Sequence, residues 1–461
     1  MPNLERIFAE ARSRTGKRPL IIIPGILGSQ LINYETGEIV WPSAFRSSDD
    51  GLSLPIMPDL ASSRDNLVAR KIVDTLRLSR LIPEVYVYHD LLEALKRYGG
   101  YKEGDWANPA PDGDRDTFYV LPYDWRRDNV ETARDFIRRL ESLKRKLKRP
   151  DLRFNVLAHS MGGLVARYAA RYGDADLPPA GARIVPTWAG AVHINKIIMF
   201  GTPNEGSADA FATMLEGYSV TEGLRRRIRL LNKLSREDAF STPSLFQLLP
   251  HAASARFLDE NLQPLQVDLY DPAVWRKYGW AAVNDPDFRE RYVRGKVFGD
   301  YAPFRGGSLE ELDAYFEIVL RRAKRFHEAL DAMTDTESES PVPLFAFGGD
   351  CEETLNAPVI LRDEKRGRWI TLTAPRSFRT STNRRVSSKE ATLAMFAPGD
   401  GRVTRRSLLA EDLAGRRRSA LFNTALPIIY AVFACDRHGD IQNNKILQDN
   451  ALTALVSEAI K

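Results

Sequence analysis

The most informative part of the chain is RFNVLAHSMGGLVARYAARY, residues 153–172. It opens with a short, continuous apolar run, which is typical of a strand buried on both faces of a parallel sheet. It closes with helical spacing in which Gly163, Ala166 and Ala170 permit close packing. Between the two lies Ser160, next to small residues. The stretch therefore predicts a buried strand, a sharp turn that carries Ser160, and a helix.

Further strands are expected on both sides of this unit. Buried apolar runs of strand length occur at residues 18–24, 117–121, 194–200, 344–347 and 427–434. Helical patterns separate several of them, and strand–helix–strand alternation predicts a parallel sheet. A serine on a turn between a strand and a helix is the nucleophile elbow of one such fold. We therefore predict an α/β-hydrolase fold: a mostly parallel central sheet flanked by helices, with helical cap and lid insertions.

The strand spacing also predicts how the chain is divided. The first part of the core should comprise residues 18–40 and 116–203, and the second part residues 342–461. Residues 41–115 are rich in Pro, Gly, Ser and Asp, and we interpret them as a cap excursion. Residues 204–341 are helical and charged, as expected of a lid and helical cap. An excursion at residues 351–397 should contain a hairpin that turns near residues 365–367.

Composition narrows the classes of partner and location. The 66 basic and 61 acidic residues leave a net charge of only +5, which is too diluted to favour nucleic acid. The local basic runs at residues 144–149, 225–229 and 416–418 are read as solvated faces, with a patch for an anionic membrane as the alternative. No apolar run approaches the roughly 18 residues of a membrane span. We expect a cytoplasmic protein, with peripheral membrane contact left open.

The two cysteines, Cys351 and Cys435, do not suggest a disulfide framework, and they show no metal-type clustering. A single bridge between them remains open. The sequence therefore predicts no metal site, and it leaves the oligomeric state undetermined.

The turn at residues 158–162 is the candidate nucleophile elbow. The turn needs small residues two before and two after the serine, and Ala158 and Gly162 meet this need, although Gly is commoner at the first position. The alternative is a structural serine in a tight turn. We predict that Ser160 is the nucleophile.

Serine needs a base, and His438 is the candidate. It follows the last predicted strand, where this fold places its base. The other histidines fit less well. His89 precedes the elbow, His159 adjoins the serine and is expected to face elsewhere, His193 opens a strand, and His251 and His327 fall in the cap.

Two aspartates compete for the role of the acid. Asp350 directly follows the strand at residues 344–347, as in a generic hydrolase. Asp400 comes later, in PGDGR, with glycines that suit a tight loop. Because Gly348 and Gly349 precede Asp350, composition alone does not separate the two.

An oxyanion hole needs two backbone N–H groups. One should come from Met161, the residue after the nucleophile. The other should come from the loop PGILG, residues 24–28, where glycines let the backbone approach the developing charge. Acyl transfer through these groups needs no metal or organic cofactor.

Taken together, these blocks resemble the lecithin:cholesterol acyltransferase family, including its phospholipid:diacylglycerol acyltransferase branch. The matching blocks, in order, are IPGILGSQL (23–31), Trp41, YDWR (123–126), HSMGG (159–163), GTP (201–203), PSLF (243–246), GDGRV (399–403) and His438. The resemblance spans nearly the whole chain, and its most specific blocks are those with Ser160 and Asp400.

The resemblance implies Ser160 as nucleophile, Asp400 as acid and His438 as base, and so decides against Asp350. It also implies that Leu27 and Met161 form the oxyanion hole and that Trp41 belongs to a substrate-binding, lipid-facing cap. Residues 207–241 would correspond to a mobile lid, with Gly217 and Gly223 as hinges and with apolar Phe211, Met214, Leu215 and Leu224 facing the cleft.

The chain departs from the family at several points. The acid block commonly continues Gly-Asp-Gly-Thr-Val-Pro, whereas Arg402 and Thr404 stand here in place of Thr and Pro. Secreted members carry a lid disulfide near the tryptophan, and this chain has no cysteine before Cys351. These departures weigh against extracellular lipoprotein chemistry and against a sterol acceptor.

The sequence thus favours a lipid O-acyltransferase that uses an acyl-serine intermediate, with a lipid or acyl ester as its partner. A lipase or phospholipase with the same residues is the nearer alternative. A catalytically silent hydrolase fold that serves as a binding protein is the more distant one.

Overall fold

The computed structural model describes residues 15–43, 51–76, 85–219, 233–295, 307–333, 340–413 and 423–456. Its centre is a seven-stranded sheet in the order β22-β15-β10-β9-β1-β8-β7, and all six pairings are parallel. The strands are β1 (Leu20–Ile23), β7 (Lys102–Glu103), β8 (Thr117–Val120), β9 (Phe154–His159), β10 (Ile194–Phe200), β15 (Leu344–Gly349) and β22 (Ile428–Ala434). The predicted parallel sheet is confirmed.

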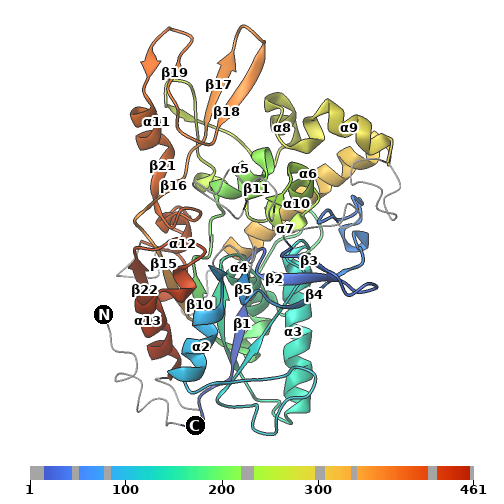
Figure 1. Cartoon of the computed structure of the whole chain (residues 1–461), viewed down its shortest axis with the longest axis vertical. Helices are drawn as coiled ribbons and strands as arrows, with labels where there is room; N and C mark the ends of the chain where they lie inside the picture. The colour runs from blue at the N-terminus through green and yellow to red at the C-terminus, as the bar shows by residue number, and fades with distance from the viewer. Residues whose placement is uncertain are drawn as a thin grey trace.

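Helices cover both faces of the sheet. Successive strand residues point to opposite faces, and because the strand residues are apolar, both faces must be buried. Ile21 and Ile23 of β1 pack in the same cluster as α3 (Asn129–Lys146) and α4 (Met161–Tyr172). Leu20 and Ile22 pack in the cluster that holds α2 (His89–Arg97) and α13 (Lys445–Val456). Figure 1 shows α3 on one side of the sheet and α2 with α13 on the other. The fold is the predicted α/β-hydrolase fold.

The helical cap is built from residues between β10 and β15. It comprises α5 (Ala208–Glu216), α6 (Arg236–Phe240), α7 (Pro243–Phe246), α8 (Pro272–Tyr278), α9 (Pro286–Val293) and α10 (Leu309–Asp331), with the short pair β11 (Tyr218–Ser219) and β12 (Lys233–Leu234). Side chains of α10 such as Phe316 and Phe326 belong to the same apolar cluster as α3 and α4. The cap and the sheet therefore share one core.

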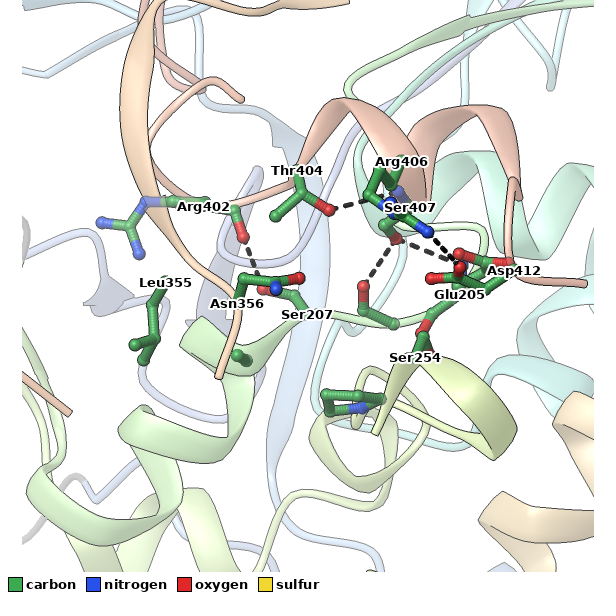
Figure 2. Close-up of a pocket in the computed structure, with 13 residues that line it drawn as sticks. Glu205, Ser207, Ser254, Leu355, Asn356, Arg402, Thr404, Arg406, Ser407 and Asp412 are labelled. Carbon is green, nitrogen blue, oxygen red and sulfur yellow. Dashed lines mark hydrogen bonds and ion pairs between the residues drawn. The ribbon is translucent and has the colours of Figure 1, made fainter. Parts of the chain in front are cut away.

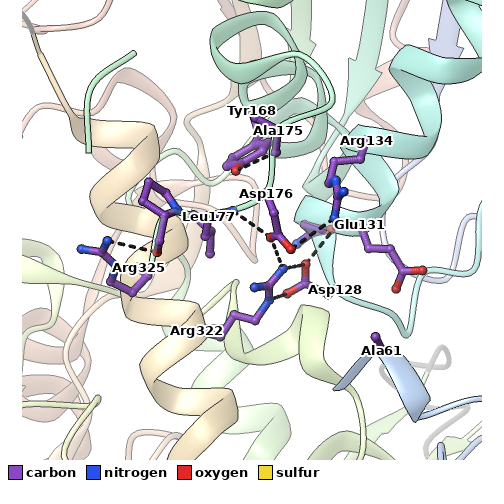
Figure 3. Close-up of polar contacts among 12 residues, drawn as sticks. Ala61, Asp128, Glu131, Arg134, Tyr168, Ala175, Asp176, Leu177, Arg322 and Arg325 are labelled. Atoms are coloured by element: carbon purple, nitrogen blue, oxygen red, sulfur yellow. Dashed lines mark hydrogen bonds and ion pairs between the residues drawn. The ribbon is translucent and has the colours of Figure 1, made fainter. Parts of the chain in front are cut away.

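An ion-pair network centred on the buried carboxylate of Asp128 fixes α10 to the core (Figure 3). Arg322 donates from Nε to Asp128 Oδ2 at 2.8 Å and from Nη2 to Asp176 Oδ1 at 2.8 Å. Asp128 is also the N-cap of α3, where its carboxylate accepts from the Glu131 amide. One carboxylate thus begins a core helix and anchors a cap helix.

The excursion at residues 351–397 contains the predicted hairpin, which is formed by β17 (Val359–Asp363) and β18 (Arg368–Leu372). It extends a small sheet with β13 (Phe257–Leu258) and β14 (Pro264–Leu265). Beneath it, β16 (Glu352–Leu355) pairs with β21 (Phe396–Gly399). Other elements are β19 (Phe378–Arg379), β20 (Arg385–Val386), α11 (Ser388–Met395) and α12 (Arg405–Leu409).

Residues 41–115 contribute to two layers. A three-stranded sheet joins β2 (Ser29–Asn33), β3 (Ile39–Trp41) and β4 (Leu67–Ile72), and β5 (Thr75–Leu76) pairs with β6 (Val85–Tyr86). However, β7 extends the central sheet and α2 packs on it, so this segment also supplies part of the core.

A disulfide joins Cys351, which lies just after β15, to Cys435, which directly follows β22. The open question about these cysteines is thereby answered: they are bonded. Within the described residues, no helix is both long and apolar enough to cross a membrane. The basic runs at residues 225–229 and 416–418 lie outside the described residues, as do Gly223 and Leu224.

Candidate active site

Ser160 occupies the sharp turn between β9 and α4. Its backbone is held at φ 53° and ψ −126°, a left-handed conformation that is strained for a residue with a side chain. The Ser160 amide donates to the Phe200 carbonyl of β10 at 2.7 Å, which fixes the turn to the sheet. A Cβ on Gly163 would lie 2.0 Å from Thr202 Oγ1, so only glycine fits where the helix begins. The local sequence thus raises the Ser160 hydroxyl at the carboxyl edge of the sheet.

His438 and Asp400 complete a hydrogen-bonded series with Ser160. His438 Nε2 lies 2.9 Å from Ser160 Oγ, and His438 Nδ1 lies 2.8 Å from Asp400 Oδ2. A carboxylate can only accept, so Nδ1 carries the ring proton and Nε2 is free to accept from the serine hydroxyl. All three side chains are buried. The structure therefore brings together the residues predicted from the sequence as nucleophile and base and the aspartate that the family resemblance implies as the acid.

The loop after β21 aims the Asp400 carboxylate. Its second oxygen, Oδ1, accepts from the Arg402 amide at 3.0 Å and from the Val403 amide at 2.7 Å. The Asp400 carbonyl in turn accepts from the His438 amide at 2.8 Å. Within the described residues no hydrogen bond or ion pair joins Asp350 to His438. Of the two candidate acids, the structure places Asp400 against the base.

The loop at residues 24–28 approaches the serine closely. A Cβ on Gly25 would lie 2.8 Å from Ser160 Cβ, so glycine is required there. Leu27 has φ 63°, and its carbonyl accepts from Trp41 Nε1 at 2.8 Å. Met161 is the first residue of α4, where amides have no partner inside the helix. Met161 directly follows Ser160, and Leu27 lines the same cleft as Ser160. The positive end of the α4 dipole is directed at Ser160.

Trp41 has a second role besides lining the cleft. It is 2% exposed, and its ring packs edge-on against Trp125 with centroids 5.8 Å apart. Trp125 donates to the Ser29 carbonyl, and its neighbour Arg126 forms buried ion pairs with Asp65 and Asp124. The YDWR block therefore supports Trp41, which in turn holds the Leu27 carbonyl.

A cleft of about 590 Å³ opens over Ser160 and His438. Much of its lining is apolar and includes Ile26, Leu27, Trp41, Val73, Leu245 and Leu248. Charged side chains also line it, among them Asp209, Glu352, Glu353, Arg402, Arg437 and Asp440. Such a shape suits an ester with a long apolar part.

Helix α5, in the predicted lid, lines this cleft differently from the expectation. Ala210 and Thr213 face the cleft, whereas Phe211 is fully buried against Trp275 and Trp280. Phe211 was expected to face the cleft, and the structure corrects this: its ring anchors α5 in the aromatic core of the cap.

Arg402, the departure from the family block, connects the acid loop to the cap. Its guanidinium donates to Asp209 at 2.7 Å and to Tyr218 Oη at 2.9 Å, and it lies 4.4 Å from the centre of the Tyr218 ring. Sequence reasoning named Arg402 only as a departure and did not predict these contacts.

A small polar pocket lies behind the acid loop (Figure 2). The Glu205 side chain in it is buried. Burial, and then the nearby charge of Asp412, raise the pKa of Glu205 to about 8. Glu205 therefore holds a proton at neutral pH.

Four of the other histidines lie away from Ser160. His251 pairs with Asp331 at 2.8 Å and stacks on buried His327, while His89 and His193 adjoin Asp74 and Glu141. His159, which was expected to face elsewhere, instead lines the cleft and hydrogen bonds to the His438 carbonyl. Among the described residues, no group of three or more His, Cys, Asp or Glu side chains could hold a metal ion.

Comparisons with known proteins agree with this architecture. Residues 71–280 match the family model described as lecithin:cholesterol acyltransferase. No curated protein is significantly similar to the sequence. Among solved structures, a chain of the Tle4–Tli4 complex is similar, with a TM-score of 0.55 and 16% identity over 95% of this chain and 98% of that one.

Two further structures are more distant. Lipase BlEst2 of Bacillus licheniformis in its mature form has a TM-score of 0.34 and 11% identity over 96% of this chain and 93% of its own. EstA from Clostridium botulinum has a TM-score of 0.34 and 12% identity over 98% and 91%. At such identities a structural likeness concerns the fold alone, so the family match carries the functional conclusion. It supports an enzyme that acts on lipid esters, as a hydrolase or an acyltransferase. Over residues 71–280, somewhat less than half of its length, the chain is similar to the lecithin:cholesterol acyltransferase family.

Proposed function

We propose that the protein is a lipid O-acyltransferase that works through an acyl-serine intermediate. One observation carries the proposal: the series Asp400–His438–Ser160 ends at a cleft with a largely apolar lining. An apolar cleft accommodates an acyl chain, and a serine that donates to a histidine is an activated nucleophile.

In the first half-reaction, Ser160 Oγ attacks the acyl carbonyl carbon and its proton moves to His438 Nε2. The negative oxygen that forms is held by the Leu27 and Met161 amides. Asp400 stabilises the imidazolium. The bond from carbon to the donor oxygen then breaks, and the donor alcohol leaves with the proton from His438. The acyl group remains on Ser160 as an ester.

In the second half-reaction an acceptor hydroxyl gives its proton to His438 and attacks the acyl-serine. Collapse returns the proton to Ser160 Oγ and releases the product. An alcohol as acceptor gives a new ester, whereas water gives a free fatty acid. The two activities share all their residues and differ only in which acceptor reaches the cleft.

The decisive experiment is product analysis with a radiolabelled phospholipid donor, with and without a long-chain alcohol. A transferase forms labelled ester at the expense of fatty acid when the alcohol is present. Fatty acid alone in both cases would identify a lipase or phospholipase. No product, with Ser160→Ala indistinguishable from wild type, would favour a binding protein.

We further propose peripheral contact with a lipid surface through the sheet of β2, β3 and β4. Ile32 pairs with Ile39 on one side and with Val68 on the other, so the three side chains share a face. Ile39 and Val68 are 44% and 41% exposed. Binding of the protein to phospholipid vesicles, reduced in Ile39→Glu, tests this contact.

The protein could be located either in the cytoplasm or in an oxidising compartment, and the disulfide bears on this choice. Disulfides persist in oxidising compartments, so the Cys351–Cys435 bond weighs against the cytoplasmic location predicted from the sequence. Alkylation of free thiols in intact cells distinguishes a cytoplasmic location from an oxidising compartment. In the cytoplasm both cysteines would be reduced and alkylated, whereas in an oxidising compartment they would stay bonded and unmodified.

A further inference from the structure

We propose that Tyr88 and His159 are positioning residues that tie the oxyanion loop, residues 24–28, to the base loop, residues 435–440. The inference rests on the proposed function, because it concerns how that site is kept in register. Neither residue belongs to the predicted set of nucleophile, base, acid and oxyanion groups.

A continuous hydrogen-bonded chain links the two loops. The Gly25 amide donates to Tyr88 Oη at 3.0 Å. Tyr88 Oη lies 2.8 Å from His159 Nδ1, and His159 Nε2 lies 3.0 Å from the His438 carbonyl oxygen. We refer to this chain as the brace.

The chemistry of its ends sets the direction of every bond in the brace. A carbonyl oxygen can only accept, so His159 Nε2 carries the ring proton and donates to His438. His159 Nδ1 is then an acceptor, and it takes its hydrogen bond from the Tyr88 hydroxyl. The Tyr88 oxygen is left to accept from the Gly25 amide. The brace therefore requires one tautomer of His159.

Burial keeps His159 neutral. Tyr88 is 1% exposed and His159 is 7% exposed. Desolvation, and then repulsion from His438, lower the pKa of His159 to about 3. The His159 and His438 rings lie 5.0 Å apart, so a charged His159 would oppose the imidazolium that forms on His438 during the reaction. A neutral ring can hold the base loop in every protonation state of His438.

The brace has little redundancy at its two ends. Other side chains fix other atoms of the oxyanion loop: Tyr123 donates to the Pro24 carbonyl at 2.9 Å, and Trp41 donates to that of Leu27. Within the described residues, however, the Gly25 amide bonds only to Tyr88, and the His438 carbonyl bonds only to His159. Removing either side chain leaves a buried polar group without its partner.

The expected consequence is a loss in kcat. The brace touches loops that supply the base and one oxyanion donor, and misplacement by about 1 Å costs on the order of 10²-fold in rate. Tyr88 and His159 also line the cleft, but ground-state binding of an apolar ester depends mainly on its apolar walls, such as Ile26, Leu245 and Leu248, and Tyr88→Phe keeps the aromatic ring. Tyr88→Phe and His159→Gln should each lower kcat for a short soluble ester by about tenfold or more and change KM by less than about twofold.

A matched control separates positioning from general stability. Tyr119 is also a fully buried tyrosine that donates to a backbone carbonyl, that of Gly113 at 2.9 Å, but it does not line the cleft. Tyr119→Phe should lower Tm about as much as Tyr88→Phe while keeping wild-type kcat and wild-type labelling by a fluorophosphonate.

A double-mutant cycle tests whether the two residues act together. If they form one brace, the variant Tyr88→Phe/His159→Gln should lose about as much kcat as the worse single variant. Losses that multiply, or a Tyr88→Phe variant as active as Tyr119→Phe, would overturn the brace.

A spectroscopic readout does not depend on turnover. In ¹⁵N-histidine spectra at neutral pH, His159 should be the neutral tautomer with the proton on Nε2, and Tyr88→Phe should shift its Nδ1 resonance. A proton on Nδ1 would contradict the brace even in an active enzyme. A correct tautomer in a wild-type protein that neither hydrolyses esters nor labels at Ser160 would overturn the proposed function, and with it the positioning role.

Discussion

The turn around Ser160 and the loops that carry Asp400 and His438 meet at one point but are held there by different interactions. The turn is set by its own neighbours in the sequence: β9 before it, α4 after it, and Gly163 where the helix crosses Thr202. Asp400 and Ser160 both contact His438, yet they lie 38 and 278 residues from it along the chain. The first region is local structure, and the second depends on tertiary contacts.

The acid and base loops are positioned from several directions. The His438 amide donates to the Asp400 carbonyl, and the His438 carbonyl accepts from His159. Arg402 ties the acid loop to α5 and β11, and the disulfide ties the base loop to the end of β15. Substitutions far from Ser160 should therefore disturb the positions of Asp400 and His438 more readily than the local turn that carries Ser160.

The largest effect is expected from the nucleophile itself. Ser160→Ala should abolish fluorophosphonate labelling and reduce ester turnover by on the order of 10⁶-fold, by analogy with serine proteases. The fold should remain, because the Ser160 hydroxyl bonds only to His438 within the described residues. Circular dichroism and Tm check the fold. Full labelling of the alanine variant would show that the reactive serine lies elsewhere.

The acid should rank next. Asp400→Asn should lower kcat by on the order of 10⁴-fold, because the amide cannot hold the base in its required tautomer. Asp350→Asn is the matched control, since Asp350 follows β15 but makes no bond to His438 within the described residues. It should retain activity within about twofold of wild type. If Asp350→Asn were the weaker enzyme, the assignment of the acid would be wrong.

Removing the disulfide tests whether tertiary contacts position the loop that carries His438. Cys351→Ser/Cys435→Ser should cost about 2–4 kcal/mol of unfolding free energy and lower kcat several-fold, because Cys435 lies three residues before His438. A reductant should bring wild-type kcat and Tm down to those of the variant and leave the variant unchanged. A wild-type enzyme that is indifferent to reductant, with the bond shown to be broken, would mean that the disulfide does not position the base.

The smallest effect concerns the polar pocket behind the acid loop. Because the pKa of Glu205 is raised in the folded state, its protonated form favours folding. That stability is complete below the unfolded pKa, near 4.5, and is lost as pH rises toward about 8. Glu205→Gln should therefore gain Tm relative to wild type as pH rises from 5 to 8, by about a few degrees. A Tm difference that is constant across this range would show that Glu205 does not titrate there.

Much of the fold follows from short-range patterns. The strand at residues 194–200 has the predicted bounds, since a buried strand is a continuous apolar run. The hairpin turns near residues 365–367 as predicted, since a hairpin needs a turn signal. The dual role of residues 41–115 was not predictable in this way. An edge strand of two residues, Lys102–Glu103, carries no apolar pattern, and only its pairing with β8 reveals it.

The same distinction applies to the site. The sequence by itself determined the turn at Ser160, the position of His438 after the last strand, and the glycine-rich loop at residues 24–28, because each depends on a handful of adjacent residues. It left Asp350 and Asp400 equivalent, since both follow strands and adjoin glycines, and only the family resemblance chose between them. The tertiary structure alone decided that Cys351 meets Cys435, that Arg402 reaches α5, and that Tyr88 and His159 join two loops. The physical reason is that these contacts depend on where the packing of strands and helices directs each side chain. A hydrogen bond between residues that are 71 or 279 positions apart in the sequence depends on how strands and helices pack. A pattern of neighbouring residues carries no information about such a contact.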